Sequence, residues 1–114
     1  MAGYKILIVE DDMDIARVEK EHLEKWDFSV HCVEDFRQVA SEAIKYQPDL
    51  ILLDIKLPYY NGFYWCSEIR KFSKIPIVFV SSADDDMNIV TAMDMGGDDF
   101  IAKPFSLSVL TAKI

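Results

Sequence analysis

The sequence of 114 residues lacks long apolar runs, glycine-rich motifs and clustered cysteines. No apolar run approaches the ~18 residues that span a bilayer, and none resembles a secretory signal, so we expect no direct membrane contact. Only four glycines are present, and they form no P-loop or dinucleotide-binding motif, so nothing favours nucleotide binding. Cys32 and Cys66 have no metal-site spacing, which predicts free thiols and a cytoplasmic location.

Basic residues are also few. Twelve Lys and Arg accompany twenty Asp and Glu, which gives a formal charge of −8. This charge argues against nucleic acid as a direct partner, because phosphate binding needs a basic surface. The apolar fraction of 51% excludes a disordered acidic tail, and the length suits one compact domain.

Short apolar runs alternate with helix-like segments along the chain. The runs predict strands at 4–9, 28–33, 50–53, 75–80 and 100–102. Amphipathic segments between them predict helices. The first covers 14–25, and its apolar stripe consists of Ile15, Val18, His22, Leu23 and Trp26. The second begins near Phe36 with Asp35 as N-cap, and its inward-facing residues are Val39, Ala40, Ala43 and Ile44.

Three more helices are expected in the second half of the chain. One opens at Asn61-Gly62, one follows the acids 84–86 and stops at Gly96-Gly97, and one begins after Pro104-Phe105. Strands that alternate with such helices predict an α/β fold, a doubly wound five-stranded parallel sheet with helices on both faces. Ligands of such sheets bind beyond the carboxyl ends of the strands.

Charged and polar side chains follow four of the predicted strands. Glu10 and Asp11 follow the first strand, and Asp54 follows the third. Ser81 comes at the end of the fourth strand, and Lys103 lies just past the fifth. Converging carboxylates need a cation or shifted pKa values, and oxygen ligands without His or Cys indicate Mg²⁺. A metal, a lysine and a nucleophilic carboxylate together predict a site for phosphoryl transfer.

These pieces together resemble a two-component response-regulator receiver domain. The resemblance rests on 6–12 (ILIVEDD), 49–58 (DLILLDIKLP) with Asn61-Gly62, the run from Pro76 to Ser81, and 97–105 (GDDFIAKPF). It implies a CheY/flavodoxin-like sheet of strand order 2-1-3-4-5. It also implies site roles: Asp54 as phosphoacceptor, Asp11, Asp54 and the Lys56 carbonyl on Mg²⁺ with Glu10 in the outer shell, Ser81 and Lys103 on the phosphoryl group, Phe100 as aromatic switch, and a cis peptide before Pro104.

The 98–105 stretch further resembles the OmpR-type subclass, whose second domain is a winged-helix DNA binder. Residues 61–66 and 80–82 resemble regulators of bacitracin and antimicrobial-peptide resistance. Residues 1–114 are therefore expected to be the receiver domain, with the DNA-binding domain outside this chain. A membrane sensor histidine kinase is the expected phosphodonor, docking near the first helix. Homodimerisation is expected through the fourth helix, fifth strand and fifth helix, with charged contacts from Asp94, Asp98, Asp99 and Lys113.

Two positions depart from the resembled family. Gly97 replaces the usual Ala, which is expected to loosen the turn before the fifth strand, and Lys113 stands where the subclass often has Arg, so an ion pair there would be monodentate.

Other functions remain open from the residues alone. A Mg²⁺-dependent phosphatase with an Asp nucleophile would need a second Asp two residues after Asp54, where this chain has Lys56. A flavin-binding electron carrier would cradle phosphate after the first strand, where this chain has three acids. A receiver that no longer accepts phosphate is disfavoured, because every chemical position holds a competent residue. We therefore expect a signalling switch that catalyses its own phosphorylation and dephosphorylation, and not an enzyme that turns over a free substrate.

Overall fold

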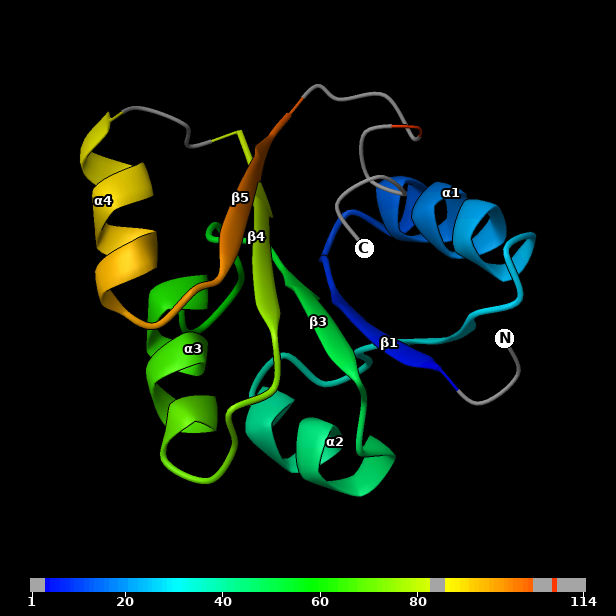
Figure 1. Ribbon diagram of the computed structural model, residues 1–114, viewed down its shortest axis with the longest axis horizontal. Helices are drawn as coiled ribbons and strands as arrows, with labels where there is room; N and C mark the ends of the chain where they lie inside the picture. The colour runs from blue at the N-terminus through cyan, green and yellow to red at the C-terminus, as the bar shows by residue number, and fades with distance from the viewer. Residues whose placement is uncertain (1–3, 83–85, 104–107, 109–114) are drawn as a thin grey trace.

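The structure is a computed structural model that describes residues 4–82, 86–103 and 108. Its centre is a parallel sheet of five strands in the order β2-β1-β3-β4-β5 (Figure 1), which confirms the expected winding. The strands are β1 (Lys5–Val9), β2 (Ser29–Cys32), β3 (Leu50–Leu53), β4 (Ile77–Ser81) and β5 (Asp99–Ala102). The three central strands are buried along their whole length apart from Lys5, as expected of a parallel sheet covered on both faces.

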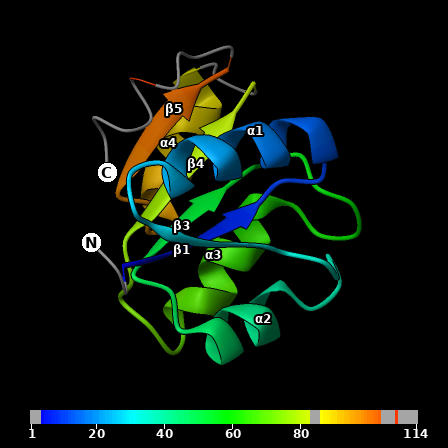
Figure 2. The same cartoon turned by 90° about the vertical axis from the view of Figure 1, so that its right-hand side faces the viewer.

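Four helices cover the sheet in the described part of the chain. They are α1 (Met13–Glu24), α2 (Val39–Tyr46), α3 (Gly62–Arg70) and α4 (Asp86–Asp94). The helix α1 lies on one face, and α2 and α3 lie on the other (Figure 2). None of these described helices is long and apolar enough to cross a membrane. The helix expected after Phe105 lies outside the described residues.

Two apolar layers hold the helices to the sheet. Leu23 of α1 packs on one face with β1, β3 and β4 side chains such as Ile6 and Val80. Residues of α2, α3 and α4 pack on the other face; they include Val39, Ala43, Trp65, Cys66, Ile69 and Ala92, with Phe79 of β4 beneath them. Because alternate residues of a strand point to opposite faces, neighbours along β4 belong to different layers.

The expected apolar stripe of α1 is partly wrong. The helix begins at Met13, where the carboxylate of Asp12 accepts hydrogen bonds from the backbone, and it buries Ala16, Glu19 and Leu23. Val18 is exposed, and Trp26 lies beyond the helix with 58% of its surface exposed. The spacing of residues 16, 19 and 23 fits one face of a helix as well as the spacing of the expected apolar residues does. The buried face differs from the expectation because it includes an acid, Glu19.

The start of α2 also differs from the prediction. The helix begins at Val39, and its N-cap is Gln38, whose side chain makes no capping bond. The expected cap, Asp35, instead accepts a hydrogen bond from the Gln38 N–H at 3.0 Å through its backbone carbonyl, in a turn before the helix. Phe36 still packs against the core from this turn, whereas Ile44, expected to face inward, is 55% exposed.

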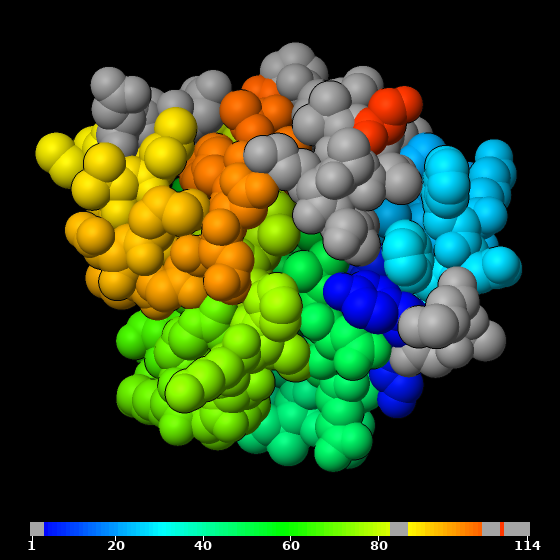
Figure 3. Space-filling view, in the orientation of Figure 1, coloured from blue at the N-terminus to red at the C-terminus, as the bar shows by residue number. Residues whose placement is uncertain are grey.

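The helix α4 lies beside β5 at one edge of the molecule (Figure 3). It ends at Asp94, and Gly96 follows with φ of 103°, a conformation that favours glycine, as the expected stop requires. Ala92 is its fully buried contact with the core, while the side chains of Met87 and Val90 are exposed. Much of the apolar surface of α4 therefore faces away from the sheet.

Candidate functional site

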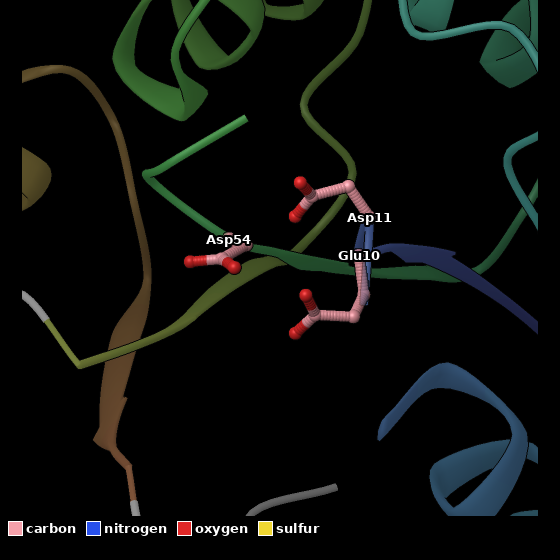
Figure 4. A group of neighbouring side chains, drawn as sticks. All are labelled: Glu10, Asp11 and Asp54. Carbon is pink, nitrogen blue, oxygen red and sulfur yellow. The ribbon is translucent and has the colours of Figure 1, made fainter. Parts of the chain in front are cut away.

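Three carboxylates converge where β1 and β3 end. Glu10, Asp11 and Asp54 each offer an oxygen, and these atoms lie within 4.8 Å of one another. Figure 4 shows the three side chains pointing toward a common space, Glu10 and Asp11 from the end of β1 and Asp54 from the end of β3. The parallel register brings them together, because β1 and β3 pair from Ile6–Leu50 to Val9–Leu53.

The cluster is buried on one side and open on the other. Glu10 and Asp54 are 5% and 6% exposed, whereas Asp11 is exposed. The buried carboxylates are held by backbone donors: Asp54 Oδ1 accepts from the Ile55 N–H at 2.7 Å, and Glu10 Oε2 accepts from the Asp12 N–H at 3.1 Å. A ligand can therefore approach two oriented carboxylates from the side of Asp11.

The ammonium group of Lys103 completes the site. Its Nζ donates to Oε1 of Glu10 and, at 3.2 Å, to Oδ2 of Asp54. Burial lowers the pKa of Lys103, but the hydrogen bond to Glu10 and the two carboxylate charges outweigh it, so that its pKa lies above the ordinary value. The lysine is therefore a fixed positive charge beside both acids.

The remaining charge of the cluster favours a cation. Burial is the main cause that raises the pKa of Glu10, and the charge of Asp54 adds to it, while Lys103 acts in the opposite direction. Three carboxylates against one ammonium leave an excess of negative charge in a partly dehydrated space. Oxygen ligands of this kind suit Mg²⁺, which is held by one or two carboxylates and keeps several waters. The donor set of this structure therefore fits the metal.

Ser81 and Phe100 lie on the two strands beyond β3. Ser81 is fully buried at the end of β4, and its carbonyl accepts from the Lys103 N–H at 3.0 Å. Phe100 of β5 is partly buried against the core, with its ring centroid 6.5 Å from that of Phe79 in a stacked arrangement. Ser81 pairs with Ala102, the residue before Lys103, and it lies on the strand next to β3, which leads to Asp54.

The start of α3 rests directly on the backbone of Asp54. A Cβ atom on Gly62 would lie 2.1 Å from the Asp54 carbonyl oxygen, so only glycine fits at this position. The Gly62 N–H donates to the carbonyl of Ile55 at 2.8 Å, and Asn61 caps the helix by accepting from the Tyr64 N–H at 2.9 Å. The Asn-Gly pair therefore fixes the backbone that carries Asp54.

A buried acid near the site was missed from the sequence. Glu19 of α1 is 3% exposed, and its Oε2 has no hydrogen-bond partner within the described residues. Burial raises the pKa of Glu19 to about 7, with a further contribution from the charge of Glu10. The signal was present in the helical spacing of Ala16, Glu19 and Leu23, but a glutamate is expected to face solvent.

The residues expected on the dimer face have several different environments. Asp94 is exposed at the end of α4. Asp98 makes bonds within the chain, since its Oδ2 accepts from the Ile77 N–H at 2.8 Å and from Arg70 Nη2 at 3.0 Å. The Asp99 carboxylate accepts from the Phe100 N–H at 2.8 Å. Lys113 and Pro104, with the expected cis peptide, lie outside the described residues.

Comparisons with known proteins identify the family. The model of the response regulator receiver domain matches residues 6–114. The chain is 48% identical over 111 residues to the uncharacterized transcriptional regulatory protein YvcP of Bacillus subtilis, covering 97% of this chain and 47% of that protein. It is 44% identical to the response regulator protein GraR of Staphylococcus aureus, covering 96% of this chain and 49% of that protein. The chain thus spans about half the length of these curated relatives.

Solved structures agree with this assignment. The N-terminal domain of the nisin resistance regulator NsrR, a lantibiotic response regulator, is 58% identical, with a TM-score of 0.89 and coverage of 97% of this chain and 94% of that chain. The BeF₃-activated receiver domain of Klebsiella pneumoniae RstA is 35% identical, with a TM-score of 0.91 and coverage of 96% and 93%. The phosphatase and the flavin carrier are not favoured by these matches. The chain belongs to the response regulator receiver domain family, and it is a phosphoacceptor domain of a two-component system.

Proposed function

We propose that Asp54 is the residue that accepts the phosphoryl group. The observation that carries this proposal is the position of its carboxylate, buried at a strand end, oriented by the Ile55 N–H and 3.2 Å from the Lys103 amine. A carboxylate held in this way presents an oxygen to an incoming phosphorus atom, while the neighbouring charges act on the phosphoryl oxygens.

The acids around Asp54 are proposed to hold Mg²⁺. Asp11 and Asp54 would bind the ion directly together with the backbone carbonyl of Lys56, and Glu10 would bind in the outer shell through water. Support comes from the three carboxylate oxygens within 4.8 Å of one another. When bound, the metal neutralises phosphoryl charge and orients the group for in-line transfer.

The reaction at Asp54 is an in-line displacement. An oxygen of the Asp54 carboxylate forms a bond to phosphorus, and the bond from phosphorus to the donor breaks. The donor is a phosphohistidine nitrogen of a kinase, whose ring takes up a proton as it leaves, or a small acyl phosphate, which leaves as a carboxylate. The product is an acyl phosphate on Asp54, which water later hydrolyses. The protein is thus its own substrate, and this distinguishes it from an enzyme with a free substrate.

The switch is proposed to involve the strands next to β3. Lys103 and the Ser81 hydroxyl would move onto phosphoryl oxygens, and Phe100 would turn further inward, which shifts the population toward a form whose α4 and β5 face dimerises. The exposed Met87 and Val90 of α4 support such an interface. Charged contacts are proposed from Asp94, Asp98, Asp99 and Lys113.

The whole protein is proposed to be a transcription regulator with a winged-helix domain after the receiver domain. Support comes from the length of the relatives, of which this chain spans about half, and from the description of YvcP as a transcriptional regulatory protein. The similarity to NsrR, a nisin resistance regulator, supports a role in resistance to antimicrobial peptides. The proposed partner is a membrane sensor histidine kinase; the receiver itself would act in the cytoplasm without direct membrane contact, and DNA would be bound only by the second domain.

The acceptor assignment is tested with Asp54→Asn. The wild-type chain and the variant are incubated with acetyl phosphate and Mg²⁺, and intact mass spectrometry measures the added phosphoryl group. We expect a hydroxylamine-labile adduct on the wild type and on the control Asp27→Asn, an exposed acid with a φ of 65° that Asn tolerates. Undiminished labile phosphate on Asp54→Asn would overturn the assignment.

A further inference from the structure

The ring of Phe79 connects three elements on one side of the sheet. Phe79 lies in β4 and is fully buried. Its ring centroid is 5.8 Å from that of Phe63 in α3 and 6.5 Å from that of Phe100 in β5. A rigid ring in close-packed surroundings transmits displacement, because its neighbours cannot move into it without moving it.

The same ring occupies the space beside Gly97, in the turn that joins α4 to β5. A Cβ on Gly97 would lie 2.7 Å from Cε2 of Phe79, 2.8 Å from its Cδ2 and 2.9 Å from the carbonyl oxygen of Ala92. The Gly97 N–H also donates to that carbonyl at 3.0 Å. The missing methyl group at position 97 therefore does not leave a gap; the aromatic ring fills it and lies against the turn at the end of α4.

The strand register links this contact to the phosphoryl site. Phe79 pairs with Leu53, the residue before Asp54, on one side and with Phe100 on the other. Ser81 lies two residues further along β4, so its side chain points to the same face as Phe79. A rearrangement of Phe100 thus reaches the ring of Phe79 across the paired strands, and Ser81 is connected to Phe79 along β4.

We propose that Phe79, seated against Gly97, is a positioning residue that couples the phosphoryl site to α4. Rotation of Phe100 displaces the Phe79 ring, and the ring displaces the turn at Gly97 and with it the end of α4. The inference rests on the proposed function, because it assigns the route by which Asp54 would control the dimer face. The contact depends on both residues, because the Phe79 ring occupies the space that a side chain at position 97 would need.

The test is a double-mutant cycle with Gly97→Ala, Phe79→Leu and the combined variant. Each 114-residue chain is studied with Mg²⁺, with and without beryllofluoride, a phosphoryl mimic. Trp fluorescence at low protein concentration measures beryllofluoride affinity, and sedimentation equilibrium measures the dimer dissociation constant. We expect both single variants to bind beryllofluoride with an affinity within about threefold of wild type. The factor by which beryllofluoride lowers the dimer dissociation constant should be at least about fivefold smaller than in wild type.

The combined variant should recover part of that effect, because the shorter leucine side chain at position 79 leaves room for the methyl group, although the Ala92 carbonyl remains close. Val39→Ala, a core truncation in α2, controls for destabilisation alone and should keep the full response. Single variants with a wild-type response, or no recovery in the combined variant, would overturn the coupling role while leaving phosphoacceptance intact. A wild-type chain that binds beryllofluoride without dimerising more strongly would overturn the proposed switch, and the coupling role with it.

Discussion

The amine of Lys103 lies 3.2 Å from Oδ2 of Asp54, although 49 residues separate them along the chain. The same amine also bonds to Glu10, so one ammonium group joins the acids that follow β1 and β3. Any anion that enters between Lys103 and Asp54 must therefore compete with Glu10 for this lysine. The strength of that competition can be measured through variants at each position.

Removal of the lysine charge should slow phosphorylation of Asp54. Lys103→Met keeps much of the side-chain volume but removes a donor that is aimed at the site, so we expect the rate with acetyl phosphate and Mg²⁺ to fall about 100-fold. Time courses by intact mass spectrometry give the rate. Lys74→Met, in the exposed loop after α3, is the control and should react as the wild type does. An unchanged rate for Lys103→Met would show that the ammonium group has no part in the transfer.

Mg²⁺ should raise the melting temperature through Asp11. Ligand that binds the folded chain alone stabilises it by about 2.7 kcal/mol at 100 times the dissociation constant. Thermal unfolding in increasing Mg²⁺ should show this shift for the wild type, and Asp11→Asn should need far more metal. Asp12→Asn is the matched neighbour: Oδ1 of Asp12 caps α1 by accepting from the N–H groups of Asp14 and Ile15, and the amide oxygen of asparagine can keep these bonds, so this variant should retain both its stability and its response to metal. Equal metal responses of the two variants would contradict the assignment of Asp11.

Glu19 should make the chain less stable as the pH rises from about 4.5 to about 7. Its pKa is raised from 4.5 to about 7 in the folded state, so in this window the unfolded chain loses a proton that the folded chain keeps. Stability is thus full below the unfolded pKa and falls with rising pH, by at most about 3 kcal/mol at 1.36 kcal/mol per pH unit.

Urea unfolding of Glu19→Gln across this pH range tests the effect. The variant should lack this part of the slope and should be more stable than the wild type at pH 8, since a neutral amide replaces a buried charge. Glu21→Gln, on the exposed side of the same helix, should follow the wild type. A wild-type slope in Glu19→Gln would assign the pH dependence to another group.

Arg70 should contribute strongly to stability without taking part in the chemistry. Its Nε and Nη2 donate to the carbonyl of Gly96 at 3.0 and 2.8 Å, its Nη1 donates to the carbonyl of Ile75 at 2.7 Å, and its Nη2 pairs with Asp98. Arg70→Met would leave partly buried carbonyls without these donors, so we expect a loss of about 3 kcal/mol in urea unfolding.

A surface ion pair provides the control for Arg70. Arg17 pairs with Asp14 at 3.2 Å on the exposed side of α1, and Arg17→Met should cost less than about 0.5 kcal/mol. If the two variants lost similar stability, the hydrogen bonds of Arg70 to the carbonyls of Gly96 and Ile75 would not be the reason for its effect.

The sheet and the place of the site could be predicted because both depend on strong local signals. The apolar run that ends before Asp54 forms β3 over Leu50–Leu53, as expected. The carboxyl ends of parallel strands share one edge, so the convergence of Glu10, Asp11 and Asp54 follows from the winding alone. The roles of these residues in phosphorylation stay predictions until the variants are measured.

Features that depend on tertiary packing could not be predicted in the same way. Asp35 has the chemistry of an N-cap, yet the chain makes a turn there and begins α2 at Val39. The apolar stripe of α1 includes Glu19, because the helix places that position against the sheet regardless of its charge. The sequence around Gly97 indicated a looser turn, and only the folded chain shows that Phe79 fills the space.

The contact between Gly62 and Asp54 gives the signal a direction. Because a Cβ atom on Gly62 would not fit between the start of α3 and the carbonyl of Asp54, the α3 side of Asp54 has no freedom to yield. If Asp54 is phosphorylated as proposed, we therefore expect the resulting strain to relax on the opposite side, toward the strands that carry Ser81 and Phe100. Gly62 holds the backbone of Asp54 in place on the α3 side, so any movement that follows a reaction at this residue is confined to the β4 and β5 side.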